Sequence, residues 1–114
     1  MAELTDKEIV AACARAIGVQ PHPMWNAAKW PTPEFLGTHG VFNPLQDDAQ
    51  AMALVKKLRL FIGDNHDVNA YKWLVFPAAL VGIKHIEALD TDLNRAICLC
   101  AARVQIEKEK NANG

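Results

Sequence analysis

The residues best suited to chemistry in this sequence are cations and aromatic rings in the second half of the chain. Such a set can bind nucleic acid, because cations contact phosphates and flat rings stack on bases. The members of this set are Lys56, Lys57, Arg59, Tyr71, Lys72 and Trp73. Structural roles explain the same residues, since cations suit the C-terminal end of a helix and Tyr71 and Trp73 alternate as one face of a strand. With a formal net charge of -1 there is no basic excess, so nucleic-acid binding is the alternative hypothesis and not the leading one.

A second candidate surface is aromatic and lies in a proline-rich arm, residues 19–46, which holds five of the six prolines. Its aromatic residues are Trp25, Trp30, Phe35 and Phe42. They can pack down as a lid over the sheet, or they can stay exposed and anchor a partner, because tryptophan is enriched in binding hot spots. Packing is favoured, since a small domain gains from every buried aromatic. The sequence leaves both alternatives open.

Catalytic and metal-binding patterns are weak in this chain. Residues 64–67 (Asp-Asn-His-Asp) offer two carboxylates and an imidazole, but Asp and Asn are also the residues that tight turns favour. The three cysteines are an odd number, which is typical of reduced thiols, and Cys13 and Cys100 fall on apolar helical stripes. No nucleophile-elbow or metalloprotease motif is present in the sequence. We therefore expect no catalytic residue, no cofactor and no metal site, and a metal-dependent enzyme is a distant third hypothesis.

Helical periodicity and capping residues indicate the elements that position these groups. Thr5 and Glu8 have the spacing of a capping box, and Gly18 supplies the residue that ends the first helix. Apolar residues then recur with helical spacing in two later segments. The three predicted helices cover about residues 5–17, 47–59 and 91–109.

Strand signals lie between the second and third helices. Residues 68–76 are rich in β-branched and aromatic side chains, and residues 81–89 alternate more weakly. Leu60 to Ile62 would add a short strand before a polar turn at residues 63–67, and residues 77–80 are short enough for a hairpin-like connection. The arm would contain at most a short edge strand. The economical arrangement is one α+β domain, residues 1–114, with a small antiparallel sheet of two to four strands sandwiched between three helices in α/β/α layers.

Composition narrows the class of protein further. A hydrophobic fraction of 51% with balanced charge argues against disorder, and no apolar run reaches the roughly 18 residues that a membrane span needs. The N-terminus carries acids where a signal peptide would be basic. We therefore expect a cytoplasmic protein without membrane contact.

Four segments together resemble a known family. They are Phe42-Asn43-Pro44-Leu45-Gln46-Asp47, the helix sequence of residues 51–58 (AMALVKKL), the strand Tyr71-Lys72-Trp73-Leu74-Val75, and Asn94-Arg95-Ala96-Ile97-Cys98. With the tryptophan-bearing arm, they resemble the small phage proteins of the ABA sandwich type, which include NinX-like proteins, over about residues 5–105. The resemblance implies a phage or prophage origin, an α/β/α layered domain of unknown function and the cytoplasm of a bacterial host. It implies no catalytic residues.

The leading hypothesis is therefore a phage or prophage accessory protein, not an enzyme, that acts through protein–protein interaction. Its partner would be a phage or host protein, and a homo-oligomer is a further option because a second copy can cover an exposed edge strand. Nucleic acid is not expected as the main partner. A small nucleic-acid-binding module with a local basic-aromatic surface is the alternative.

Overall fold

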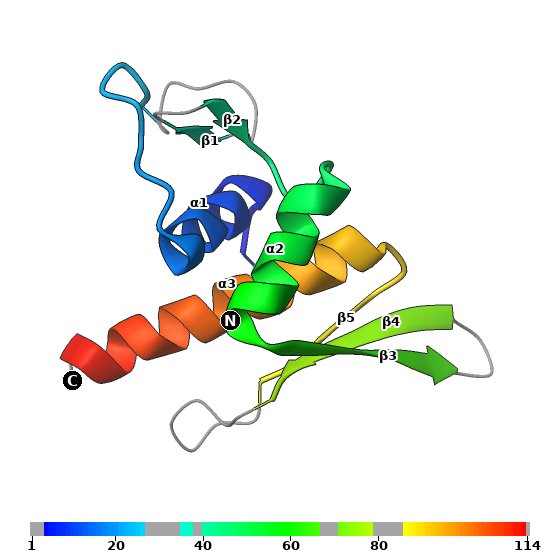
Figure 1. The fold of residues 1–114 in the computed structure, drawn as a ribbon. Coiled ribbons are helices and arrows are strands. Elements are labelled where there is room, and N and C mark those ends of the chain that lie inside the picture. The colour runs from blue at the N-terminus through cyan, green and yellow to red at the C-terminus, as the bar shows by residue number, and fades with distance from the viewer. Residues whose placement is uncertain (1–3, 27–34, 38–39, 67–70, 79–85, 114) are drawn as a thin grey trace.

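The structure is a computed structural model that describes residues 4–26, 35–37, 40–66, 71–78 and 86–113. The expected α+β class is confirmed: three helices accompany two small antiparallel sheets, and helices flank a sheet. In chain order, the elements are α1 (Asp6–Ile17), β1 (Phe35–Gly37), β2 (Gly40–Phe42), α2 (Asp48–Leu58), β3 (Leu60–His66), β4 (Tyr71–Pro77), β5 (Ala88–Asp90) and α3 (Leu93–Asn113) (Figure 1).

The first helix begins and ends at the residues that the sequence indicates. The Thr5 hydroxyl accepts a hydrogen bond from the Glu8 amide at 3.2 Å, and the Glu8 carboxylate accepts one from the Thr5 amide at 2.9 Å. This reciprocal pair satisfies two amides that the first turn leaves without helical partners. Gly18, at φ 81°, takes the left-handed conformation that ends the helix.

The other two helices also follow their capping residues. Asp47 accepts a hydrogen bond from the Gln50 amide at 3.0 Å and so begins α2, which ends at a left-handed Arg59. The Asp92 carboxylate accepts from the Asn94 amide at 3.0 Å at the start of α3. α3 covers Leu93–Asn113, so it begins two residues later and ends four residues later than the predicted span of about 91–109.

The three-stranded sheet has the order β3-β4-β5, and all its pairs are antiparallel. β3 pairs with β4 without interruption from Leu60 opposite Pro77 to His66 opposite Tyr71. The prediction of a polar turn at residues 63–67 is therefore wrong for residues 63–66. The long partner strand satisfies the backbone of these residues and overrides their preference for a turn. Asp67 lies outside the described residues.

The last strand is shorter than expected, and its connection is longer. β5 covers only Ala88 to Asp90, with Ala88 opposite Val75 and Asp90 opposite Trp73. Of the expected strand 81–89, residues 81–85 lie outside the described part, and Ile86 and Glu87 precede the strand. The hairpin-like connection at 77–80 is wrong, because β4 runs to Pro77 and its partner begins only at Ala88.

Within the arm, the expected short edge strand is part of a separate hairpin. β1 pairs with β2, from Phe35 opposite Phe42 to Gly37 opposite Gly40, and Pro21 bridges to Gly37. A Cβ atom on Gly37 would lie 2.9 Å from the Val19 side chain, so only glycine fits this crossing. The hairpin lies over α1, on the opposite side of the helices from the three-stranded sheet (Figure 1).

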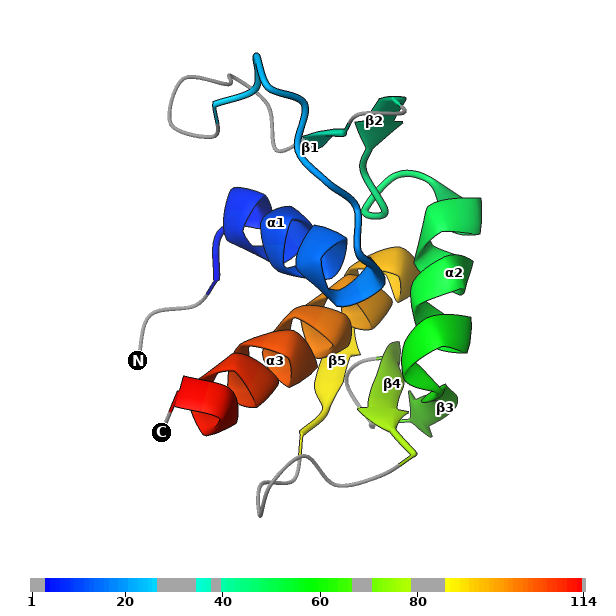
Figure 2. The ribbon, with the colours of Figure 1, turned by 60° about the vertical axis from the view of Figure 1, so that its left-hand side comes forward.

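α3 forms the centre of the molecule. It packs against α1 and α2 on one side and against β4 and β5 on the other (Figure 2). The largest fully buried side chains are Ile9, Leu54, Ile97, Val10, Val75 and Val104. Within the described residues, helices cover only one face of the three-stranded sheet. In the same part of the chain, no helix is long and apolar enough to cross a membrane.

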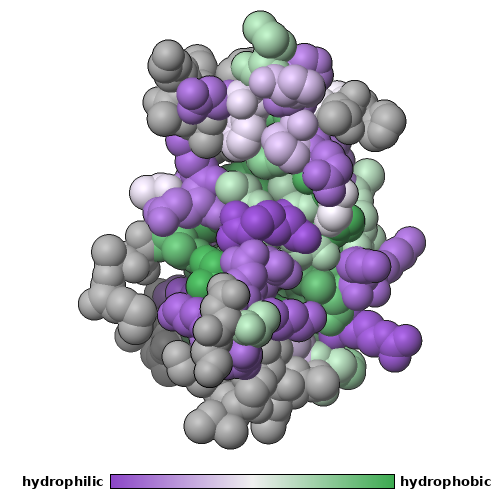
Figure 3. Space-filling view, turned by 90° about the vertical axis from the view of Figure 1, so that its left-hand side faces the viewer, coloured by the Kyte–Doolittle hydropathy of each residue, from purple (hydrophilic) through white to green (hydrophobic). Residues whose placement is uncertain are grey.

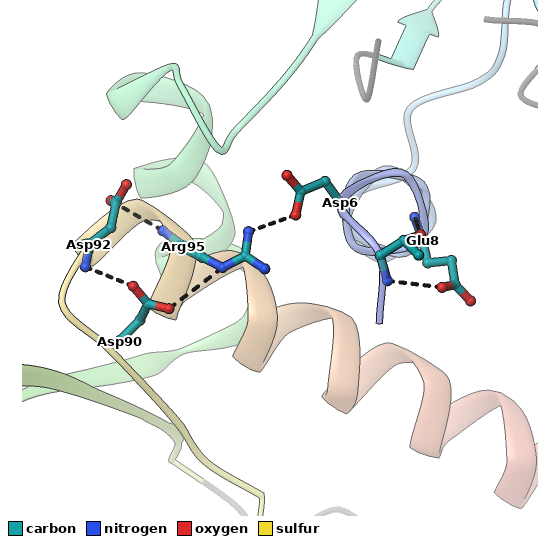
Figure 4. Close-up of polar contacts among 6 residues, drawn as sticks. Asp6, Glu8, Asp90, Asp92 and Arg95 are labelled. Atoms are coloured by element: carbon teal, nitrogen blue, oxygen red, sulfur yellow. Dashed lines mark hydrogen bonds and ion pairs between the residues drawn. The ribbon is translucent and has the colours of Figure 1, made fainter. Parts of the chain in front are cut away.

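Polar contacts fix α1 and β5 to the start of α3 (Figure 4). The Arg95 guanidinium donates to the Asp6 carboxylate at 2.6 Å and lies 3.5 Å from the Asp90 carboxylate. At the other end of the helix pair, Arg15 of α1 donates to both oxygens of Glu109, at 2.7 and 3.0 Å. These exposed pairs link the elements but stabilise the fold little, because each contributes at most about 1 kcal/mol.

Candidate functional site

The two faces of the three-stranded sheet differ in how they are covered. Side chains alternate along each strand, so the cross-strand partners Val75 and Ala88 share a face, and both are fully buried. Trp73, two positions from Val75, also packs against the buried core. This face receives α3.

The opposite face keeps large apolar side chains in contact with solvent. Phe61 of β3 is 55% exposed and lies opposite Phe76 of β4, and Leu89 of β5 is 38% exposed and lies opposite Leu74. The two phenylalanine rings stack, with centroids 5.4 Å apart and an interplanar angle of 21°. Leu74 and Phe76 are only partly buried and do not pack against the core. We call Phe61, Leu74, Phe76 and Leu89 the open face.

The open face carries little charge. Among the described strand positions on the same side of the sheet as the open face, only Lys72 is ionisable. Gly63, which follows Phe61 on this side of β3, adds no side chain. By contrast, the side of the molecule drawn in Figure 3 has hydrophilic residues across its middle, with apolar groups between them. An apolar, nearly uncharged surface favours contact with another apolar surface.

The structure separates the described members of the predicted basic-aromatic surface. Lys56, Lys57 and Arg59 lie at the end of the sheet where Leu60 pairs with Pro77. Lys72 is five positions from Pro77 along β4, which corresponds to about 17 Å. Trp73 packs into the core from the face opposite Lys72, and the Tyr71 side chain lies outside the described residues. Among the described side chains, the cations at the end of α2, Lys72 and the Trp73 ring therefore do not meet at one point.

The aromatic arm packs as a lid. Phe35 and Phe42 are each only 6% exposed, and the Trp25 ring lies 4.3 Å from the Phe35 ring and packs against the core. Of the two alternatives left open for the arm, these three residues therefore take the favoured one, packing, although they cover the outer side of α1 and not the three-stranded sheet. Trp30, the fourth member, lies outside the described residues.

All three cysteine thiols are buried, and those of Cys13 and Cys100 are held protonated. The Cys13 thiol donates to the Cys98 carbonyl at 3.3 Å, and this contact together with burial raises the pKa of Cys13 far above that of a free thiol. Burial also raises the pKa of Cys100 to about 12. A nucleophilic cysteine requires a lowered pKa, so neither thiol has the character of one. Among the residues that the structure describes, no group of three or more His, Cys, Asp or Glu residues could hold a metal ion.

Sequence reasoning missed the open face as a site. The alternation of β4 already places Leu74 and Phe76 on the face of Lys72, and this was the available signal. The contribution of Phe61 was hidden because its pairing with Phe76 of β4 was not predicted. Comparisons with protein-family models, curated proteins and solved structures found no match to this chain. The resemblance to phage ABA sandwich proteins therefore stays a prediction.

Proposed function

We propose that this protein is an accessory protein of a phage or prophage that works in the bacterial host cytoplasm by binding another protein, without catalysis. The open face is the proposed contact surface. The observation that carries the proposal is the stacked Phe61–Phe76 pair, which lies beside Leu74 and Leu89 and is left in contact with solvent. Aromatic side chains on a rigid sheet lose little entropy on binding, so they make efficient contact surfaces.

A protein partner fits the open face better than nucleic acid does. Phosphate binding depends on several cations along one surface, and here Lys72 lies about 17 Å along the strand from the cations at the end of α2. The rings that were expected to stack on bases include Trp73, which contacts the core. Burial of apolar area against an apolar partner is therefore the stronger source of affinity.

The proposal also moves the contact surface away from the arm. Trp25 and Phe35 contribute to folding, so substitutions there would remove the fold together with any interaction. Leu89 offers a cleaner probe because it is 38% exposed and lies at the edge of the open face. A lysine at this position can keep its charge in water while it disrupts an apolar contact.

The test is affinity purification of the tagged chain from the cells that encode it, quantified by mass spectrometry. Three chains are compared: the wild type, Leu89→Lys, and the control Met52→Lys, which adds the same charge at an exposed position of α2. We expect at least a tenfold loss of one co-purified protein for Leu89→Lys alone, with circular dichroism unchanged. Equal recovery from Leu89→Lys and the wild type would contradict the proposal.

Salt dependence separates the two classes of partner. An apolar protein contact should persist as salt rises from 50 to 500 mM, whereas phosphate binding weakens by several orders of magnitude. A complex that is lost over this range and contains nucleic acid would favour the alternative hypothesis.

A further inference from the structure

The outer edge of β3 has no partner strand among the described residues, because the sheet order is β3-β4-β5. β3 is seven residues long and pairs with β4 one residue to one, without a bulge. It contains neither proline nor lysine. Most natural edge strands are protected against pairing by bulges, prolines or charged side chains, and of these β3 has only the Asp64 carboxylate, so this long edge favours a further strand.

The register shows which backbone groups face outward. Pro77 has no amide hydrogen, so Leu60 and Pro77 form a non-hydrogen-bonded pair. The pairs then alternate, and Phe61 and Gly63 direct their backbone groups to β4. Consistent with this alternation, the Ala78 amide donates to the Arg59 carbonyl at 3.0 Å. The outward amides and carbonyls therefore belong to Leu60, Ile62, Asp64 and His66.

We propose that this edge pairs with the β3 edge of a second copy of this chain, antiparallel and with the two-fold axis at Ile62. The three-stranded sheets of two copies would then form one continuous sheet. This inference goes beyond the proposed function and does not rest on it, because it concerns the edge of the sheet and not its open face.

Charge and side-chain size select this register. With the axis at Ile62, the Ile62 side chains of the two copies lie opposite each other. Phe61 then lies opposite Gly63 of the second copy, which has no side chain to oppose the ring. Asp64 lies opposite Leu60, and the two Asp64 carboxylates are about 14 Å apart along the paired strands. A register centred on Gly63 would bring the same carboxylates into diagonal contact at about 7–8 Å, which like charges disfavour.

The helices leave room for the second copy. Ile62 points to the helical face but is 36% exposed, because α3 contacts β4 and β5 while α2 lies at the start of β3. Figure 1 shows β3 leaving the C-terminal end of α2 and running away from it along β4. Pairing would cover the exposed Ile62 side chain and would join the open faces of both copies into one surface.

The first test is the mass of the protein in solution. The chain is 12.6 kDa, so light scattering after size exclusion should give about twice that mass at tens of micromolar. Ile62→Lys places two ammonium groups opposite each other and should weaken the dimer at least tenfold, whereas the control Met52→Lys should not. A wild-type chain that stays monomeric at 200 μM, or an Ile62→Lys dimer as tight as the wild type, would overturn the inference.

A cross-linking experiment tests the register. In hydrogen-bonded antiparallel pairs the Cα atoms are about 5.5 Å apart, within disulfide range. Ile62→Cys treated with diamide should therefore form an intermolecular disulfide, in which two thiols give their hydrogens to diamide. Asp64→Cys should not, because its copies are about 14 Å apart. The native thiols are buried and act as an internal control. Equal cross-linking at both positions would overturn the proposed register.

The variants also separate this inference from the proposed function. Leu89→Lys should remain dimeric while it loses its protein partner. If the wild type is monomeric and Leu89→Lys still loses the protein partner, the dimer is overturned and the open-face proposal stands.

Discussion

The same substitution at two aromatic positions distinguishes a structural role from a surface role. Phe35 is 6% exposed and touches Trp25, so Phe35→Ala removes almost a whole buried ring and leaves a cavity. Such changes cost about 3–5 kcal/mol in the free energy of unfolding. Phe61 is 55% exposed, so Phe61→Ala loses less than half of the roughly 3 kcal/mol that full burial of the ring would contribute to the free energy of unfolding. It also loses about 0.5–1 kcal/mol from the stack with Phe76. We expect a cost of about 2 kcal/mol or less there.

Urea unfolding followed by circular dichroism measures this difference. With an m-value of about 1.5 kcal/mol/M, Phe35→Ala should lower the midpoint by about 2–3 M and Phe61→Ala by about 1 M, both with unchanged m. Phe35→Leu, which keeps most of the volume, serves as a milder probe if the alanine variant does not fold. A midpoint that falls further for Phe61→Ala than for Phe35→Ala would refute the assignment of the arm as a lid.

Three further predictions concern the helices and thiols. Thr5→Ala should lower the free energy of unfolding by about 1 kcal/mol and Thr5→Ser should not, because only alanine removes the capping oxygen; equal urea midpoints would contradict the capping box. The hydrogen bond from Arg15 holds the pKa of Glu109 below its ordinary value of 4.5, so their pairing stabilises the fold above that pH and is lost as the pH falls through the lower folded value. Arg15→Gln should therefore cost up to about 1 kcal/mol at pH 7 and nothing near pH 2, and an equal cost at both values would count against the pair. The three cysteine thiols should react with Ellman's reagent about a hundredfold more slowly in the native state than in urea, and rapid stoichiometric labelling of one native thiol would show that burial does not protect it.

Local signals in the sequence predicted the helices well. Thr5, Glu8 and Gly18 act within a few residues of one another, so their spacing alone sets the limits of the first helix. Asp47 acts in the same way at the start of α2. The α+β class followed because the helical and strand patterns are separated along the chain.

Long-range pairing and packing limited the rest of the prediction. The polar residues at 63–66 resemble a turn locally, and only the pairing with β4 makes them a strand. The alternation of β4 shows that Leu74 and Phe76 share a face, but it does not show which face α3 covers. In the same way, the burial of Phe35 depends on the position of α1, which no nearby residue specifies. The open face is therefore visible only once the helices are in place.

The central claim, that the open face contacts a partner protein, is tested most directly by site-specific photo-cross-linking in the cells that encode the chain. A benzophenone-bearing phenylalanine analogue replaces Leu89 on the open face or Met52 on α2, and both positions are exposed. We predict a covalent adduct with one protein at position 89 and none at position 52. The absence of an adduct at position 89, or the same adduct from both positions, would contradict the claim.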